Sequence, residues 1–198
     1  MKPIIIAITG PSCAGKDTLM RQLYTEFYQW NMIERFPHVY YIVSSTTRPP
    51  RVNEIDNKDY HFITNKEFLN KIIHNEMLEW TQFRNWKYGT DKHSVSHKPG
   101  AINIGVFNLQ GIKSLEQQDE FEIIPIYLKV HWRERLRRSI KREGQLTFEM
   151  IRRLITDYKD FKNPWKILCQ NNNLLIYSQN YNIDDVMQDL LGKIELYK

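Results

Sequence analysis

The sequence lacks several features that define whole classes of protein. It has only two cysteines, Cys13 and Cys169, and neither lies in a Cys-x-x-Cys pair or near a histidine at metal-ligand spacing. A disulfide framework and a zinc site are therefore not expected. The apolar run near the start is far too short to cross a membrane, and no small-residue cleavage site typical of a signal peptide follows it. Repeats and low-complexity linkers are absent as well, so we expect a cytoplasmic globular protein.

The composition that remains is ordinary for such a protein. The 198 residues suffice for one well-packed domain and are few for two independent ones. Hydrophobic residues make up 41% and charged residues 26% of the chain, which excludes disorder throughout. The 28 Lys and Arg exceed the 23 Asp and Glu by five. This excess suits a partner that carries phosphates but does not require one.

The pattern of apolar residues predicts an α/β fold. Residues 4–9 are β-branched and apolar without alternation, which is typical of a buried strand, and Gly10 ends the run. Residues 15–29 place Leu19, Leu23 and Phe27 on one face of a helix. A strand, a glycine loop and a helix in this order open a βα unit of a parallel sheet flanked by helices. Further strands are expected at 39–43, 100–107, 122–130 and 173–177, and further helices at 108–117, 131–142, 147–162 and 183–196.

Residues 44–93 interrupt this alternation. They contain two adjacent prolines, polar turns, many aromatic residues and one short helix, whose start is marked by a capping box between Thr64 and Glu67. We expect a small mixed insertion of short strands that closes on a ligand. The single domain would then consist of a core (1–43, 94–130 and 155–198), this insertion (44–93) and a helical lid (131–154).

A glycine-rich loop lies between the first predicted strand and the first predicted helix. Its residues match the pattern G-x-x-x-x-G-K: Gly10, Pro11, Ser12, Cys13, Ala14, Gly15 and Lys16. In this context the pattern indicates a phosphate-binding loop, whose backbone N–H groups surround phosphate oxygens at the start of a helix. Lys16 is expected to reach the β- and γ-phosphates of a nucleotide. Without the strand and the helix, the loop would be an ordinary turn with a solvated lysine.

The residue after Lys16 departs from the usual pattern. Asp17 stands where such loops normally have Ser or Thr, whose hydroxyl binds Mg²⁺. Asp17 can bind the metal directly or through water, and Thr18 can supply a hydroxyl from the next position. Both residues are candidates for the metal and complete the expected nucleotide-binding segment.

Several spaced motifs follow in the insertion. They are Ser44-Ser45-Thr46-Thr47-Arg48-Pro49-Pro50-Arg51, Asp59-Tyr60-His61-Phe62, Glu79-Trp80 and Tyr88-Gly89-Thr90. Together with the phosphate loop they resemble guanylate kinases through most of the chain, most strongly over 4–20 and 40–90. The resemblance implies a P-loop kinase that uses ATP and Mg²⁺ to phosphorylate GMP or dGMP.

The resemblance also implies which residues bind the acceptor phosphate. Arg48 and Arg51 would grip it, since guanidinium forks pair bidentately with phosphate oxygens. Tyr60 and Tyr88 would add hydroxyl donors to the same phosphate. Taken singly, each of these residues has a plainer interpretation as a solvated charge or a core aromatic.

Three further positions match those that read the guanine base, namely Ser44, Glu79 and Thr90. An ionised carboxylate only accepts hydrogen bonds, and guanine offers two adjacent donors, N1–H and the 2-amino group. Adenine presents an acceptor at N1 and would leave Glu79 unpaired, a mismatch that buried polar sites punish heavily. Glu79 alone could equally be a surface carboxylate.

The chain departs from the family at two positions around the end of the third predicted strand and at one position just after the last. Val106 and Asn108 stand where the family typically has Asp, although Asn108 can still accept a hydrogen bond from the acceptor nucleotide. Ser178 stands where the family often has Asn near the adenine. Nucleotide preference, metal handling or turnover are therefore expected to differ from those of a typical member.

Residues 131–142 form the most basic run of the chain. At helical spacing Arg135, Arg138 and Arg142 share one face. The resemblance places lid arginines at Arg138, Arg142 and Arg153, which would close over the phosphates and neutralise charge on the transferred group. For Arg133, Arg135 and Arg137 the expectation is a solvated face, and a non-specific nucleic-acid site is the alternative for the whole run.

The sequence thus predicts in-line transfer of the γ-phosphoryl group of ATP to GMP or dGMP, with Lys16, Arg48, Arg138, Arg142 and Arg153 as the catalytic residues. One alternative is a kinase of ribose 1,5-bisphosphate or another acceptor, because such enzymes share the fold and an Asp after the loop lysine. Another is a non-catalytic guanylate kinase-like module that binds protein. No nucleic-acid or membrane partner is expected, and the sequence does not indicate an oligomeric state.

Overall fold

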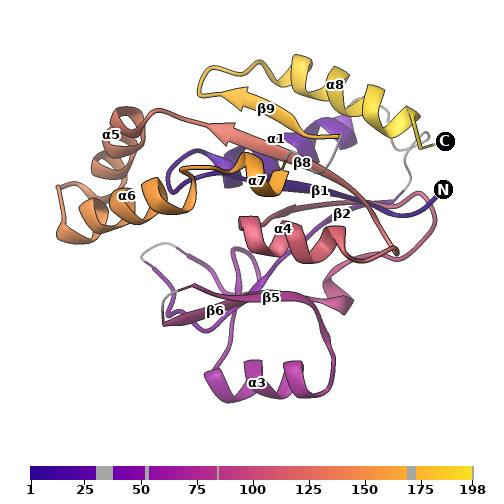
Figure 1. Ribbon diagram of the computed structural model, residues 1–198, viewed down its shortest axis with the longest axis horizontal. Helices are drawn as coiled ribbons and strands as arrows, with labels where there is room; N and C mark the ends of the chain where they lie inside the picture. The colour runs from indigo at the N-terminus through magenta and orange to yellow at the C-terminus, as the bar shows by residue number, and fades with distance from the viewer. Residues whose placement is uncertain (30–37, 52–53, 84, 169–172, 198) are drawn as a thin grey trace.

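The computed structural model describes residues 1–29, 38–51, 54–83, 85–168 and 173–197, and Cys169 lies outside these ranges. A parallel sheet of five strands forms its centre (Figure 1), in the order β2-β7-β1-β8-β9. The strands are β1 (Ile4–Thr9), β2 (Val39–Tyr41), β7 (Ile102–Val106), β8 (Glu122–Lys129) and β9 (Leu175–Ser178). All five lie within two residues of the predicted bounds. The expected α/β class is confirmed.

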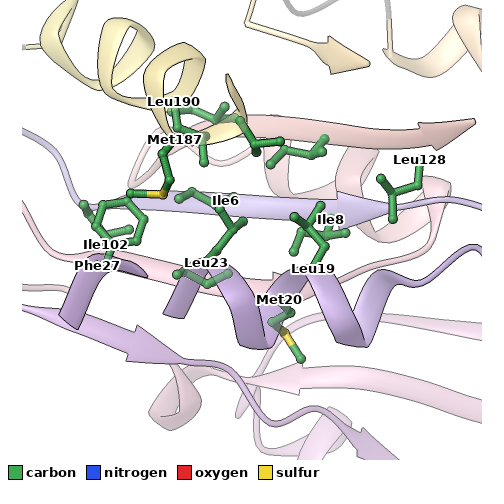
Figure 2. Packing of buried hydrophobic residues seen from close by; sticks show 14 of the residues in the cluster. Ile6, Ile8, Leu19, Met20, Leu23, Phe27, Ile102, Leu128, Met187 and Leu190 are labelled. Carbon is green, nitrogen blue, oxygen red and sulfur yellow. The ribbon is translucent and has the colours of Figure 1, made fainter. Parts of the chain in front are cut away.

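Helices cover both faces of this sheet. Helices α1 (Lys16–Gln29) and α8 (Ile183–Glu195) pack on one face, and α4 (Leu109–Glu116) and the short α7 (Trp165–Leu168) pack on the other. The side chains of β1 alternate between these layers, because successive residues of a strand point to opposite faces. Ile6 and Ile8 meet Leu19, Leu23 and Phe27 of α1 (Figure 2), which confirms the predicted apolar face of that helix.

A second, mixed sheet lies beside the central one. Its order is β4-β3-β6-β5, built from β3 (Ser45–Thr46), β4 (His61–Phe62), β5 (Met77–Phe83) and β6 (Trp86–Asp91). Helix α3 (Asn65–Ile73) lies beyond it in Figure 1, and a short 3₁₀ turn, Lys92–Ser94, follows β6. The predicted capping box is present, with Thr64 accepting from the Glu67 N–H and Glu67 accepting from the Thr64 N–H.

Two helices extend beyond the end of β8. Helix α5 (Trp132–Glu143) ends at Gly144 in the left-handed conformation (φ 78°), and α6 (Phe148–Asp160) starts at its cap Thr147. They lie side by side at one end of the molecule (Figure 1). Helix α6 runs without a break across residues 154 and 155, where the predicted lid was to end. Among the described residues, no helix has the length and apolar composition to span a membrane.

Candidate active site

The candidate site lies where the strands of the central sheet reach their carboxyl ends. The phosphate loop follows β1, Asn108 follows β7, and α5 follows β8. In open parallel sheets this edge is where ligands bind, because the loops leaving adjacent strands meet there. The sequence order of strand, loop and helix thus places three separate segments around one position.

The phosphate loop has the backbone that its glycines were expected to allow. Gly10 has φ 149°, and a Cβ atom there would lie 2.8 Å from the carbonyl oxygen of Leu128 on β8. Gly15 has φ 99°, which is open to glycine and strained for other residues. Cys13 adopts the left-handed conformation (φ 59°) without being a glycine, so the loop holds it in a costly conformation.

Lys16 bends back over the loop. Its Nζ donates to the carbonyl oxygens of Gly10 at 2.9 Å and Pro11 at 3.1 Å. Burial lowers the pKa of Lys16, opposed by the nearby charges of Asp17 and Asp157. A desolvated ammonium held by carbonyls alone favours an additional anionic partner, as a phosphate would provide.

Asp17 and Thr18, the two candidates for Mg²⁺, are both exposed at the start of α1. The structure describes no cluster of three or more His, Cys, Asp or Glu that could hold a metal by itself. Mg²⁺ commonly binds through one or two carboxylates together with phosphate oxygens and water. An exposed carboxylate directly after the loop lysine therefore fits Mg²⁺ that arrives with nucleotide phosphates.

The three residues predicted to read guanine lie together in the second sheet. Thr90 Oγ1 donates to Glu79 Oε1 at 2.9 Å, and Ser44 Oγ lies 3.3 Å from Thr90 Oγ1. Glu79 and Thr90 are opposite each other in the ladder between β5 and β6. Glu79 is only 7% exposed, so its interpretation as a surface carboxylate is wrong.

The carboxylate of Glu79 approaches the start of α4. A Cβ atom on Gly111 would lie 2.8 Å from Glu79 Oε2, so the glycine leaves room for this carboxylate, whereas Asn108 Oδ1 would be at an ordinary contact distance of 3.5 Å. Asn108 caps α4 by accepting from the Gly111 N–H at 2.7 Å. Burial raises the pKa of Glu79 to about 7, although the hydrogen bonds from Thr90 oppose this shift. The site thus contains a buried carboxylate that titrates near neutral pH.

Arg48, predicted to bind the acceptor phosphate, is held by a carboxylate that the sequence analysis did not single out. Its two terminal nitrogens donate to the two oxygens of Glu54 at 2.8 and 3.0 Å. The rings of Tyr60 and Phe62 lie 5.4 and 5.6 Å from the guanidinium carbon. Arg48 is 8% exposed, and its Nε is buried without a partner. Its interpretation as a solvated loop charge is therefore wrong.

The other predicted phosphate ligands surround this pair. The Arg51 N–H donates to Glu54 at 2.7 Å, and the rings of Tyr60 and Tyr88 lie 6.2 Å apart, edge to face. Burial raises the pKa of the Tyr60 hydroxyl, which keeps it a donor. Although the Arg51 side chain is 44% exposed, desolvation of its guanidinium and the charges of Arg48 and of Arg153 on α6 lower the pKa of Arg51. Positive groups of the second sheet and of α6 therefore act on the same region.

The three predicted lid arginines have different partners. Arg138 donates to the carbonyl of Ala14 in the phosphate loop at 3.1 Å and to Glu134 at 2.8 Å. Arg142 is paired with Glu143 at 2.9 Å, and Arg153 with Glu149 at 2.9 Å. The structure thus joins Arg138 to the loop by a hydrogen bond, whereas Arg142 pairs within α5, and Arg153 pairs both within α6 and with Glu143 of α5 at 3.7 Å.

The expectation of a solvated face is wrong for Arg135. Arg133 and Arg137 are exposed as predicted, but Arg135 is 6% exposed and donates to Asp157 at 2.6 Å. Asp157 also accepts from the N–H and the hydroxyl of Ser12 in the phosphate loop. Helical spacing alone put Arg135 with Arg138 and Arg142, but it could not reveal a buried acid on another helix.

Glu54 and Asp157 are therefore the two residues that sequence reasoning missed. Glu54 had a local signal, because it lies three residues after Arg51, the last residue of the motif, and opposite charges at short spacing pair readily. Asp157 had none, since its partner Ser12 is 145 residues away in the chain. Only the packing of α6 against the phosphate loop brings these residues together.

A phosphate loop after the first strand of a parallel sheet, beside a small mixed sheet with a buried carboxylate and arginine, is typical of the P-loop nucleoside monophosphate kinases. The guanylate kinase family model matches residues 1–188. The chain belongs to the guanylate kinase family, and the resemblance seen in its motifs is confirmed.

Comparisons with individual proteins agree with this assignment. A guanylate kinase from Synechococcus is 35% identical over 175 residues, which cover 86% of this chain and 76% of the relative. One from Clostridium perfringens is 29% identical over 197 residues, covering 97% and 81%. The crystal structure of guanylate kinase from Anaplasma phagocytophilum shares the fold, with a TM-score of 0.66 at 19% identity over 99% of this chain and 86% of that one.

Proposed function

We propose that this protein transfers the γ-phosphoryl group of ATP to GMP or dGMP, with the donor on the phosphate loop and the acceptor in the second sheet. The observation that carries this proposal is the buried Glu79 carboxylate, which accepts a hydrogen bond from Thr90 and lies beside the first turn of α4, after the carboxyl end of β7 in the sheet that also bears the phosphate loop. A buried carboxylate of raised pKa gains most from a ligand that offers two N–H donors, and the guanine edge does so.

The acceptor phosphate would bind at Arg48. Glu54 occupies the edge of the guanidinium formed by its two terminal nitrogens, and Arg48 Nη1 also donates to the carbonyl of Pro49. The Nε–H and one hydrogen of Nη2 remain, and these two donors lie on the same side of the planar group. They form a fork that suits two phosphate oxygens, with the hydroxyls of Tyr60 and Tyr88 as further donors.

The donor would bind with its β- and γ-phosphates in the loop of residues 10–18. Lys16 would exchange its bonds to two loop carbonyls for phosphate oxygens, a stronger, charge-assisted interaction. Mg²⁺ bound with ATP would be held through Asp17, with Thr18 as the second candidate, and would neutralise charge on the β- and γ-phosphates.

Transfer would proceed by positioning and charge neutralisation. The phosphate of GMP is largely ionised near neutral pH, so its oxygen attacks without a general base. Lys16 and Arg138 would act from the loop, Arg48 from the acceptor side, and Arg142 and Arg153 from α5 and α6, on charge developing over the transferred group. Helices α5 and α6 would also exclude water and so limit hydrolysis of ATP.

A coupled assay of ADP release tests the proposal across GMP, dGMP, AMP, UMP and ribose 1,5-bisphosphate. Efficient turnover is expected with GMP or dGMP alone, because AMP would leave the Glu79 carboxylate unpaired. Equal rates with AMP and GMP would refute the role of Glu79. Turnover with ribose 1,5-bisphosphate alone would identify a sugar-phosphate kinase, and an absence of ATP binding by calorimetry would identify a non-catalytic module.

A further inference from the structure

Asp157 on α6 makes bonds to the phosphate loop that the transfer chemistry does not require. Its Oδ2 accepts from the Ser12 N–H at 3.0 Å, and its Oδ1 lies 3.1 Å from the Ser12 hydroxyl, which donates to it. One carboxylate therefore holds both the backbone and the side chain of a single loop residue. Asp157 is 5% exposed, so water does not compete for these bonds.

Arg135 of α5 completes this arrangement. Its Nη1 donates to Asp157 Oδ2 at 2.6 Å and approaches the Ser12 carbonyl at 3.5 Å, whereas its Nε is buried without a partner. The void among the loop, α5 and α6 is about 10 Å³, no more than the space of about one water molecule. Ser12, Arg135 and Asp157, which we call the loop latch, join three segments that are far apart in sequence.

A contribution to folding stability does not by itself explain why the chain has the loop latch. Burying an ion pair costs desolvation that its attraction often fails to exceed, and an apolar pair of similar volume is frequently as stable. The unpartnered Nε of Arg135 adds to that cost. What the pair provides, and an apolar pair could not, is an acceptor aimed at the Ser12 N–H.

The latch also fixes the face of α6 that points towards the site. Arg153 lies one helical turn before Asp157, so the two side chains project from the same face. Arg153 lines the same void as Ser12 and Cys13 of the phosphate loop, and its charge lowers the pKa of Arg51. On α5, Arg138 makes a second tie to the loop through Ala14. Docking Asp157 onto Ser12 therefore sets the position of Arg153 relative to both substrates.

We propose that Asp157 is a positioning residue, which together with Arg135 holds the phosphate loop in its binding conformation and docks α6 beside it before a nucleotide arrives. The proposal rests on the donor role of the loop given above. The strained φ of Cys13, the next residue after Ser12, explains why the loop needs such support. Without it, the loop would relax, and ATP binding would have to restore the conformation.

The test compares the wild-type protein with the double variant R135M/D157L, in which an apolar pair replaces the ion pair without leaving a buried charge. Two quantities are measured: amide hydrogen exchange of the peptide covering residues 10–16 in the nucleotide-free protein, and the KM values for ATP and GMP. The exchange measurement does not depend on any enzymatic activity, so it remains informative even if the proposed reaction were wrong.

We expect exchange of the 10–16 peptide to be faster and the KM for ATP to rise at least about tenfold, as the loss of charge-assisted hydrogen bonds implies. The KM for GMP should change less. The control is R152M on the same helix, which removes an exposed ion pair to Glu149 while the pair of Glu149 with Arg153 remains. It should leave both quantities at wild-type values.

Wild-type exchange or a wild-type KM for ATP in a folded double variant would overturn the proposal, because the pair would then be only a packing element. If the double variant does not fold, D157N serves as the test, since its amide keeps the shape of the Asp157 side chain but loses the charge that pairs with Arg135. Faster exchange together with a higher KM for ATP in D157N supports the loop latch, and wild-type values of either quantity refute it.

Discussion

Thr90 Oγ1 donates a hydrogen bond to Glu79 Oε1 at 2.9 Å, and this uses the only hydrogen of the hydroxyl. Ser44, whose Oγ lies 3.3 Å from Thr90 Oγ1, must then be the donor of the second bond. The series of hydrogen bonds from Ser44 through Thr90 ends on a carboxylate, and the hydroxyl hydrogens of Ser44 and Thr90 both point towards Glu79. This polarity leaves Glu79 Oε2 as an acceptor beside the first turn of α4, where a guanine edge can meet it.

The first prediction concerns the pH dependence of GMP binding. The pKa of Glu79 is about 7, and guanine requires the ionised form, so below that pH binding must release a proton. The affinity for GMP should fall as the pH decreases from about 8 to about 5.5, by up to about tenfold per pH unit from Glu79. Calorimetric titrations over this range measure it. Because the GMP phosphate also titrates, E79Q is the control, and parallel profiles for the two proteins would contradict the prediction.

The second prediction concerns the stability of the ligand-free protein. The pKa of Glu79 is about 7 in the folded state and has its ordinary value of 4.5 in the unfolded chain. Between these two pH values the folded protein therefore keeps the Glu79 proton, whereas the unfolded chain has released it. Glu79 thus contributes stability at low pH that is lost as the pH rises through about 7. E79Q should be more stable than wild type at pH of about 8, by up to about 3 kcal/mol, and the difference should vanish at pH of about 4. Denaturant unfolding at both pH values checks this, and a constant difference would speak against a buried, titrating carboxyl.

The sequence predicted the elements of the central sheet closely because each carries its own local signal. The run at residues 4–9, the apolar face of Leu19 and Leu23, and the capping box at Thr64 are all patterns within one element. Motifs in register also brought Ser44, Glu79 and Thr90 into one hypothesis before any contact among them was known.

The burial and pairing of charged residues could not be predicted in the same way. Whether Arg135 faces water or an acid depends on how α5 packs on α6 and on the loop. That packing brings Arg135 together with Asp157, 22 positions away, and with Ser12, 123 positions away. The exposed interpretation was the better statistical choice for a lysine- and arginine-rich helix, and tertiary structure overrode it. The same reason explains why Asp157 was not recognised.

The third prediction tests Asn108, where the family typically has Asp. N108D should preserve the cap of α4, because an aspartate accepts from the Gly111 N–H equally well. It would also place a negative charge near the Glu79 carboxylate, which disfavours the ionised form of Glu79. The pH at which GMP affinity is half lost should therefore move upward. The same calorimetric titrations measure this midpoint, and a downward shift would show that the two side chains do not interact as described.

The fourth prediction concerns Glu54, which holds Arg48 through two hydrogen bonds. E54A would leave Arg48 buried without its anionic partner, so the guanidinium would no longer be held in the orientation that suits the acceptor phosphate. The KM for GMP should rise at least about tenfold, with little change in the KM for ATP. The control is E76A in the same sheet region, since the Glu76 side chain is 43% exposed and forms a long ion pair of 3.9 Å with Lys71. Equal increases in both KM values would indicate general loss of structure instead.

The fifth prediction separates chemistry from folding at the phosphate loop. Among the described residues, the Lys16 ammonium donates two hydrogen bonds, both to loop carbonyls, and burial of its charge is unfavourable, as its lowered pKa indicates. K16A should therefore leave the thermal midpoint of the ligand-free protein within a few degrees of wild type, at a cost of about 1 kcal/mol or less. Turnover should fall at least about a hundredfold, because the charge that follows the transferred phosphoryl group is lost. K2A, which removes an exposed lysine before the amino end of β1, should retain full turnover. A K16A protein that unfolds well below the wild-type midpoint would mean that Lys16 supports the loop, and the drop in turnover would then not measure its role in transfer.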